Sequence, residues 1–279
     1  MCVHTNARRV DPTRTVLVRR NFERELVRRF KRVKAAIRKS IVEDNDLVLN
    51  ARFDFPRSEQ KVSAFMDWIR EMVSRDVLEV SYGTPVERAA SQHWTNVYLR
   101  SAYQKGLEHA ASQIRKGGGT VAQEWVDSGF YRPVHADRAG LIYTRTYSDL
   151  KGVTDAMDSQ ISSVLAQGII EGRGVQQIAR MLTDRVDKIG ITRARVIART
   201  EVIRAHAEAT LNSYEEAGVA GVQVQAEFTT AQDNAVCRKC KALEGKKYPI
   251  EKAHGIIPVH PNCRCAFLPI VEAQGIELR

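Results

Sequence analysis

Four cysteines and a histidine near the end of the sequence constrain the fold of this chain more than any other feature. Cys237 and Cys240 form a Cys-x-x-Cys pair, and after nineteen residues they are followed by His260, Cys263 and Cys265. Two residues between thiolates let a tight turn direct both sulfurs at one tetrahedral ion, with Zn–S distances of about 2.3 Å, while a distant segment supplies the other ligands. The spacing therefore predicts a zinc site with five candidate ligands for four positions.

We expect Cys237, Cys240 and Cys263 to bind the ion, with Cys265 or His260 as the fourth ligand. The first forty residues contain no apolar stretch followed by a cleavage site, so we expect no secretory signal and a chain that matures in a reducing cytoplasm. There, clustered cysteines indicate a metal before a disulfide. The alternative is a set of reduced, partly buried thiols, or disulfides that form after lysis.

The zinc is expected to be structural, and the chain is not expected to be an enzyme. A catalytic zinc keeps an open coordination position beside an acid or a base. The sequence has no His-Glu-x-x-His motif and no His-x-Glu paired with Pro-Cys-x-x-Cys. Asp233 and Glu244 lie near the cysteines in the sequence, but nothing marks either as a catalytic base.

Positive charge is concentrated at the beginning of the sequence. Residues 1–39 hold thirteen basic and three acidic residues, whereas the remaining 240 residues contain thirty of each. A block of this kind commonly contacts nucleic acid or an acidic protein surface. The 43% apolar and 27% charged residues are typical of a soluble globular protein. No apolar run approaches the roughly 18 residues that would span a bilayer, so no membrane contact is expected.

This basic block has the period of an amphipathic helix over residues 21–40. The apolar residues that recur at steps of three and four, and therefore share one face, are Phe22, Leu26, Phe30, Val33 and Ile37. We expect the surrounding cations to contact nucleic acid or a partner; they are Arg19, Arg20, Arg24, Arg28, Arg29, Lys31, Arg32, Arg38 and Lys39. They could neutralise DNA phosphates without reading sequence. Alternatively, the apolar stripe packs on the protein's own core or on a helix of a partner protein, with the arginines solvated or paired with acidic residues of that partner.

Further helices are expected over residues 58–77, capped by Ser58, over residues 85–116, and from about residue 143 to Gly168. Residues 120–140 show no clear periodicity.

A short helix is expected after Gly174, and a turn at residues 188–190 leads to a long helix that begins at Thr192 and ends before Gly218. Alternating apolar residues then predict strands at residues 222–228 and 266–271. The fold class is therefore α+β: a mainly helical N-terminal region, a long helix and a small cysteine-rich, zinc-knuckle-like domain with strands. We divide the chain into a basic arm (1–40), a helical domain (41–119), a helical connector (120–170) and a C-terminal domain (171–279).

Several motifs of the C-terminal part occur together in a known family. They are Gly-Val-Gln-Gln-Ile-Ala-Arg at residues 174–180, Arg-Val-Ile-Ala-Arg-Thr-Glu at 195–201, Asp233 before the cysteine pair, Leu-Glu-Gly at 243–245, and Pro-Val-His-Pro-Asn-Cys-Arg-Cys at 258–265. In this combination, over about residues 160–272, the chain resembles the phage head morphogenesis family, the minor head proteins similar to protein F of phage Mu. Some members lack the first cysteine pair, so membership alone does not imply a metal.

The resemblance implies a low-copy minor head protein of a tailed double-stranded DNA phage. It would lie near the portal or the inner capsid in the virion, after assembly in the host cytoplasm. The implied partners are the portal protein, the major capsid protein or a scaffold, with non-specific contact to packaged double-stranded DNA as a further expectation. The resemblance implies no established catalysis.

Arg199 and Glu201 lie two residues apart in the predicted long helix, so they cannot share a face. We expect a structural role, in which one of them points into the seam between this helix and the knuckle and finds a partner for its charge. The alternative is a catalytic Arg and Glu pair, as in ADP-ribose transfer, but the Ser-x-Ser strand and Glu-x-Glu loop of such enzymes are missing. A second enzymatic alternative is a zinc-containing treble-clef nuclease in which His260 is a base or a metal ligand.

Overall fold

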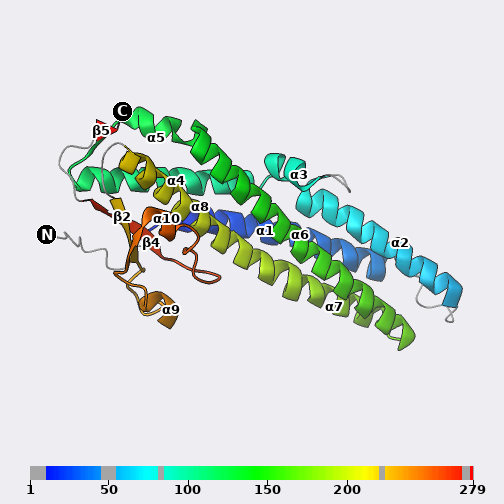
Figure 1. Cartoon of the computed structure of the whole chain (residues 1–279). Helices are drawn as coiled ribbons and strands as arrows, with labels where there is room; N and C mark the ends of the chain where they lie inside the picture. The colour runs from blue at the N-terminus through cyan, green and yellow to red at the C-terminus, as the bar shows by residue number, and fades with distance from the viewer. Residues whose placement is uncertain (1–10, 45–54, 81–84, 220–223, 272–276, 279) are drawn as a thin grey trace. The chain divides into compact units, whose positions relative to one another are not determined.

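The computed structural model of the chain describes residues 11–44, 55–80, 85–219, 224–271 and 277–278 and is mainly helical (Figure 1). The longer helices are α1 (Val16–Arg38), α2 (Phe55–Val73), α4 (Asn96–Lys116), α6 (Pro133–Ile170), α7 (Val175–Arg185) and α8 (Thr192–Val219). The short helices are α3 (Val86–Gln92), α5 (Gln123–Ser128), α9 (Arg238–Lys241) and α10 (Ile250–Ala253). The strands are β1 (Thr120–Val121), β2 (Val224–Thr229), β3 (Lys247–Pro249), β4 (Ala266–Val271) and β5 (Glu277–Leu278). The expected α+β class is confirmed.

The chain folds into two compact units, each assembled from segments that are distant in the sequence. The first unit comprises residues 1–21, 95–143 and 198–279, and the second comprises residues 22–94 and 144–197. Helices α1, α6 and α8 each contribute residues to both units. The division of the sequence at residues 40, 119 and 170 stays a proposal about sequence regions. None of the described helices is long and apolar enough to cross a membrane.

In the second unit, the apolar stripe of α1 lies in the core. The stripe residues that have no exposed surface are Phe22, Leu26, Phe30, Val33 and Ile37. A β-carbon added at Gly190 would lie 2.5 Å from the ring of Phe30, so only glycine leaves room for this ring. Gly190 belongs to a π-helical turn, Val186–Ile191, that joins α7 to α8. The turn expected at residues 188–190 was wrong, because the chain stays helical where Phe30 packs against it.

Two helix boundaries also differ from the prediction. Helix α2 begins at Phe55, so Ser58 lies inside the helix and does not cap it. The predicted third helix is interrupted at His93, which has an extended backbone with ψ of 141°. Next to it, the indole nitrogen of Trp94 donates a hydrogen bond of 2.8 Å to the carbonyl oxygen of Val77. This tertiary contact stabilises the break between α3 and α4, which no local sequence pattern indicates.

The first unit contains a three-stranded antiparallel sheet in the order β3-β2-β4. Strand β4 coincides with the strand predicted at residues 266–271, whereas Val222 of the other predicted strand lies outside the described residues. Ala226 and Phe228 of β2 are buried, as the alternation predicts. Phe228 packs edge-on against Phe267 of β4, with ring centroids 6.0 Å apart. Elsewhere in this unit, residues 120–140 form β1, α5, a 3-10 turn and the beginning of α6.

The sheet is attached to α4 and α8 through β4. The imidazole of His109 in α4 and the hydroxyl of Tyr214 in α8 both reach the carbonyl oxygen of Phe267, at 3.2 and 3.4 Å. Burial lowers the pKa of His109 to about 4, so the ring is neutral at pH 7 and its Nε2–H can donate to the carbonyl. Two helices that are distant in the sequence thus hold one strand.

Helices α4 and α8 approach each other closely because small residues lie at their contact. A β-carbon at Gly106 would lie 2.4 Å from the carbonyl oxygen of His206 and 2.6 Å from the β-carbon of Ala209. The hydroxyl of Thr210 lies 3.3 Å from the carbonyl oxygen of Gly106, to which it can donate. The contact at Gly106 therefore has no room for a larger residue.

Gly106→Ala is expected to lower the free energy of unfolding by about 1 to 3 kcal/mol, because the added carbon overlaps the backbone of α8. Gly152→Ala in α6 is the matched control, since its added carbon would meet no neighbouring atom within 4 Å. The control should instead stabilise its helix by about 0.5 to 1 kcal/mol. Urea unfolding followed by circular dichroism measures both variants, and equal effects would contradict the close contact.

Candidate metal centre

Sulfur and imidazole atoms from two segments of the first unit meet around Cys240. The Nε2 atom of His260 lies 3.1 Å from the sulfur of Cys237 and 3.1 Å from that of Cys240. The sulfur of Cys240 also lies 3.9 Å from that of Cys263, and the sulfurs of Cys240, Cys263 and Cys265 all lie within 4.8 Å of one another. The structure thus brings the five predicted ligands together in two groups of three that share Cys240.

The local backbone directs these side chains toward one another. Cys237 caps α9, and its sulfur accepts a hydrogen bond of 3.4 Å from the backbone N–H of Cys240. On the second segment, Asn262 has a left-handed backbone with φ of +64°, a conformation that asparagine tolerates. Its N–H donates to the hydroxyl of Thr200 in α8, and Cys265 directly precedes β4. The cluster therefore joins a helical turn, a loop and a sheet strand.

The hydrogen bonding of His260 suits a metal ligand. Its Nδ1 atom lies 2.7 Å from the carbonyl oxygen of Pro261. Because a carbonyl only accepts, Nδ1 carries a proton, so Nε2 is the ring nitrogen that can offer a lone pair at the two sulfurs. Metal-binding histidines are commonly oriented by a hydrogen bond of this kind from the other ring nitrogen.

The thiols compete for protons because they lie so close together. A hydrogen bond from Cys265 lowers the pKa of Cys263 to about 5, so Cys263 is a thiolate at pH 7. Burial, and then the charge of Cys263, raise the pKa of Cys240 to about 12, so this thiol keeps its proton. A cation would remove the competition, because a bound metal deprotonates its thiol ligands. The cluster could therefore hold a metal ion, whereas which four residues bind it stays a prediction.

The two acidic residues near the cysteines have structural partners. The carboxylate of Asp233 forms two bonds of 2.6 Å with Arg264, which lies between Cys263 and Cys265. The carboxylate of Glu244 accepts a bond of 2.8 Å from the backbone N–H of Thr230 at the end of β2. No sequence pattern indicates the role of Glu244. The role of Asp233 has a local signal, since Asp233 also accepts from the N–H two residues ahead, as turn-forming aspartates do.

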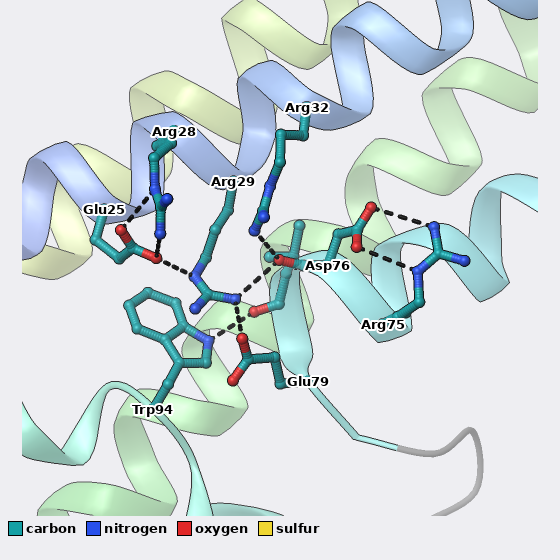
Figure 2. A network of polar contacts seen from close by, with 9 residues as sticks. Glu25, Arg28, Arg29, Arg32, Arg75, Asp76, Glu79 and Trp94 are labelled. Atoms are coloured by element: carbon teal, nitrogen blue, oxygen red, sulfur yellow. Dashed lines mark hydrogen bonds and ion pairs between the residues drawn. The ribbon is translucent and has the colours of Figure 1, made fainter.

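Arg29, which was predicted to contact nucleic acid or a partner, is buried in the second unit. Its side chain is 7% exposed and pairs with Glu25 at 2.8 Å and Glu79 at 2.7 Å. Figure 2 shows that the same guanidinium donates to the carbonyl oxygen of Asp76 and lies over the ring of Trp94, 4.0 Å from its centre. The prediction is corrected for this residue, because its charge is fully used inside the unit.

Several other cations of α1 also have partners within their own unit. Arg28 pairs with Glu25 at 2.7 Å, and Arg32 donates to the carbonyl oxygen of Asp76 at 3.3 Å (Figure 2). Arg19 pairs with Asp11 in the first unit. The members of the predicted set that are exposed are Arg20, Arg24, Arg28, Lys31, Arg32, Arg38 and Lys39. Their contact with DNA or a partner stays a prediction.

Arg199 and Glu201 differ in burial, as two residues on different sides of a helix should. Glu201 is 2% exposed, and its carboxylate pairs with Arg204 at 3.1 Å, whereas Arg199 is exposed. A buried carboxylate needs such a partner to offset the loss of water. Glu201 is thus the inward member of the pair.

Fold and cluster together define a mainly helical protein whose C-terminal sheet carries a site able to hold a metal. Residues 159–268 match the family model described as Phage Mu protein F like protein, a segment that contains all five cluster residues. Minor head protein GP7 of Bacillus phage SPP1 is 22% identical over 277 residues, covering 93% of this chain and 84% of that protein. These two matches support a phage head morphogenesis family for the chain. No solved structure matches it.

A second relative of the chain is named as an enzyme. NAD(+)--arginine ADP-ribosyltransferase EFV of Enterococcus faecalis (strain ATCC 700802 / V583) is 25% identical over 138 residues, which are 45% of this chain. The match covers 28% of that protein, so the chain spans less than a third of its length. The similarity is therefore to a part of a larger protein.

Cys240→Ser is expected to remove bound metal, because both groups of donors need Cys240. Cys2→Ser is the control, since it makes the same change at a cysteine that is distant from the cluster in the sequence. The metal content of the purified full-length protein, measured by mass spectrometry, separates the two. His260→Ala and Cys265→Ser then identify the fourth ligand by which of them loses the metal. A full metal complement in Cys240→Ser would exclude this centre.

Arg29→Ala is expected to lower the free energy of unfolding by about 1.5 to 3 kcal/mol, because it removes the buried hydrogen bonds of this guanidinium to Glu25 and to the carbonyl oxygen of Asp76. Arg28→Ala is the matched control on the same helix, where the side chain is 64% exposed and its ion pair should contribute about 0 to 1 kcal/mol. Denaturant titration compares the two. A small effect at Arg29 would show that its network does not stabilise the second unit.

Proposed function

We propose that the chain is a minor head protein of a tailed double-stranded DNA phage, incorporated in few copies at the portal or the inner capsid. The observation that carries the proposal is that the family match and the cysteine and histidine cluster fall on the same residues, 159–268. Similarity to the SPP1 minor head protein over 93% of the chain supports the same role for the helical part. The protein would pass from the host cytoplasm into the virion, with the portal, major capsid or scaffold protein as its partner.

We propose Zn²⁺ as the metal, with a structural role. Thiolates and an imidazole are the donors that tetrahedral zinc prefers in proteins. Strands β2, β3 and β4 have six, three and six residues, and helices α9 and α10 have four residues each. So little regular structure buries a small core, and a bound ion would supply much of the folding free energy of this segment.

The two enzymatic alternatives are less well supported. A treble-clef nuclease needs His260 to face a substrate, but its Nε2 faces two thiols. ADP-ribose transfer has the enterococcal relative in its favour. Against it, Glu201 is buried and paired with Arg204, so this carboxylate does not face solvent as a substrate-binding group would. Transfer from NAD⁺ that is lost in Glu201→Gln and kept in Glu215→Gln, an exposed glutamate of the same helix, would favour the enzyme.

Quantitative mass spectrometry of purified phage particles tests the proposal. We expect a constant, low ratio of this protein to the portal and major capsid proteins, in full heads and in emptied heads alike. Loss on emptying would mean that the protein leaves with the DNA and is not a fixed head component. Absence from both kinds of particle would contradict the proposal.

A further inference from the structure

The segment around the metal centre carries a local excess of positive charge that the balanced sequence outside residues 1–39 conceals. Residues 224–271 contain seven basic and four acidic residues. We call the six exposed basic residues the knuckle surface; they are Arg238, Lys239, Lys241, Lys246, Lys247 and Lys252. Arg238 and Lys239 lie between the two cysteines of the Cys-x-x-Cys pair, and Lys241 follows the second cysteine.

Two of the four acidic side chains in this segment are engaged by groups other than these cations. Asp233 is bound to Arg264, and Glu244 accepts the N–H of Thr230. Among the residues that the structure describes, none forms an ion pair with a member of the knuckle surface. On α1, by contrast, Arg28, Arg29 and Arg32 have partners within the second unit. The six cations of the knuckle surface are therefore available to a ligand.

We propose that the knuckle surface binds the phosphate backbone of double-stranded DNA. The inference rests on the proposed function, in which the protein lies beside packaged DNA. Five of the six side chains are lysines, which bind phosphate as point charges and are depleted at protein–protein interfaces. Protein–DNA interfaces, by contrast, are strongly positive.

The rest of the surface also fits DNA better than a protein partner. The large hydrophobic side chains that are exposed among the described residues are Leu17, Trp68, Val97, Tyr131, Val134, Leu141 and Ile170, and none lies in residues 224–271. A protein interface would need such an anchor at its centre. Tyr248 is the one aromatic residue in 238–252, which is too few for a platform that stacks the bases of a single strand. The ligand is therefore duplex DNA, contacted without sequence preference.

The metal centre gives these cations a fixed position. Residues 238, 239 and 241 belong to one helical turn whose ends are held by Cys237 and Cys240. Lys246 and Lys247 follow at β3, whose register with β2 pairs Lys247 with Glu227. A cation that is already positioned loses less freedom when it binds than one on a flexible tail.

The test compares two triple variants of the full-length protein that lose the same charge. The knuckle variant is Arg238→Gln, Lys239→Gln and Lys241→Gln, and the α1 variant is Arg24→Gln, Lys31→Gln and Arg38→Gln.

Binding to a fluorescent duplex of random sequence is followed by anisotropy over a range of salt concentrations. Each lost phosphate contact reduces the slope of log K against log salt by about 0.9. We expect a reduction of about 2.7 for the knuckle variant, with affinity at 0.1 M salt falling more than roughly tenfold. The α1 variant should keep the slope of the natural chain, which would leave contact with a partner protein as the role of these three cations.

Metal content, measured on the same samples, shows whether the knuckle variant is folded. If it has lost metal, Lys246→Gln with Lys247→Gln removes charge at the beginning of β3 instead, and a slope reduced by about 1.8 is expected. An unchanged slope in the metal-bound knuckle variant would overturn the inference, as would an equal or larger effect of the α1 variant. Unchanged DNA binding together with loss of the variant from assembled heads would assign the surface to an acidic protein. The ratio of the natural chain to the portal in particles tests the proposed function separately.

Discussion

The contacts around Cys240 are the constraint on which the C-terminal part of the chain depends. Between the end of β2 and the beginning of β4, residues 230–265 contain one strand of three residues and two helices of four. A segment with so little regular structure has few backbone hydrogen bonds and little apolar surface to oppose its conformational entropy. Because Cys237 and Cys240 come from one end of it and His260, Cys263 and Cys265 from the other, the cluster closes the whole segment at a single place.

This closed segment and strand β4, which follows it, are fixed to helices α4 and α8 of the first unit by hydrogen bonds. His109 and Tyr214 hold the carbonyl oxygen of Phe267 in β4, and Thr200 holds the loop at Asn262. The carboxylate of Glu208 in α8 adds a third point, since it accepts from the N–H of Gly255 at 3.1 Å. Helix α8 thus contacts strand β4, the ligand loop and the segment that precedes this loop. The position of the cluster follows from the packing of this helix.

Sequence patterns predicted the features that depend on local periodicity or spacing. The buried stripe of α1, strand β4 and the grouping of the five ligands all follow from residues at fixed intervals. The errors arose where a distant side chain decides the local structure. The helix break at His93 depends on Trp94 reaching Val77, and the helical passage through Gly190 depends on Phe30. Likewise, nothing in the neighbourhood of Arg29 indicates that Glu79, fifty residues later, will take up its charge.

Predictions from charge are limited in the same way. A count of charged residues along the sequence does not distinguish side chains that form ion pairs from those that do not. The thirteen cations of residues 1–39 suggested a binding arm, yet Arg29 stabilises a core and Arg28 shares Glu25 with it. The smaller excess at residues 224–271 lies beside a cluster that would be negative, since three thiolates outweigh one divalent ion. Nearby lysines and arginines therefore lower the electrostatic cost of gathering the thiolates, and they still point into solvent. By linkage, any anion that binds these cations and the metal that binds the thiolates must each change the affinity for the other by the same factor.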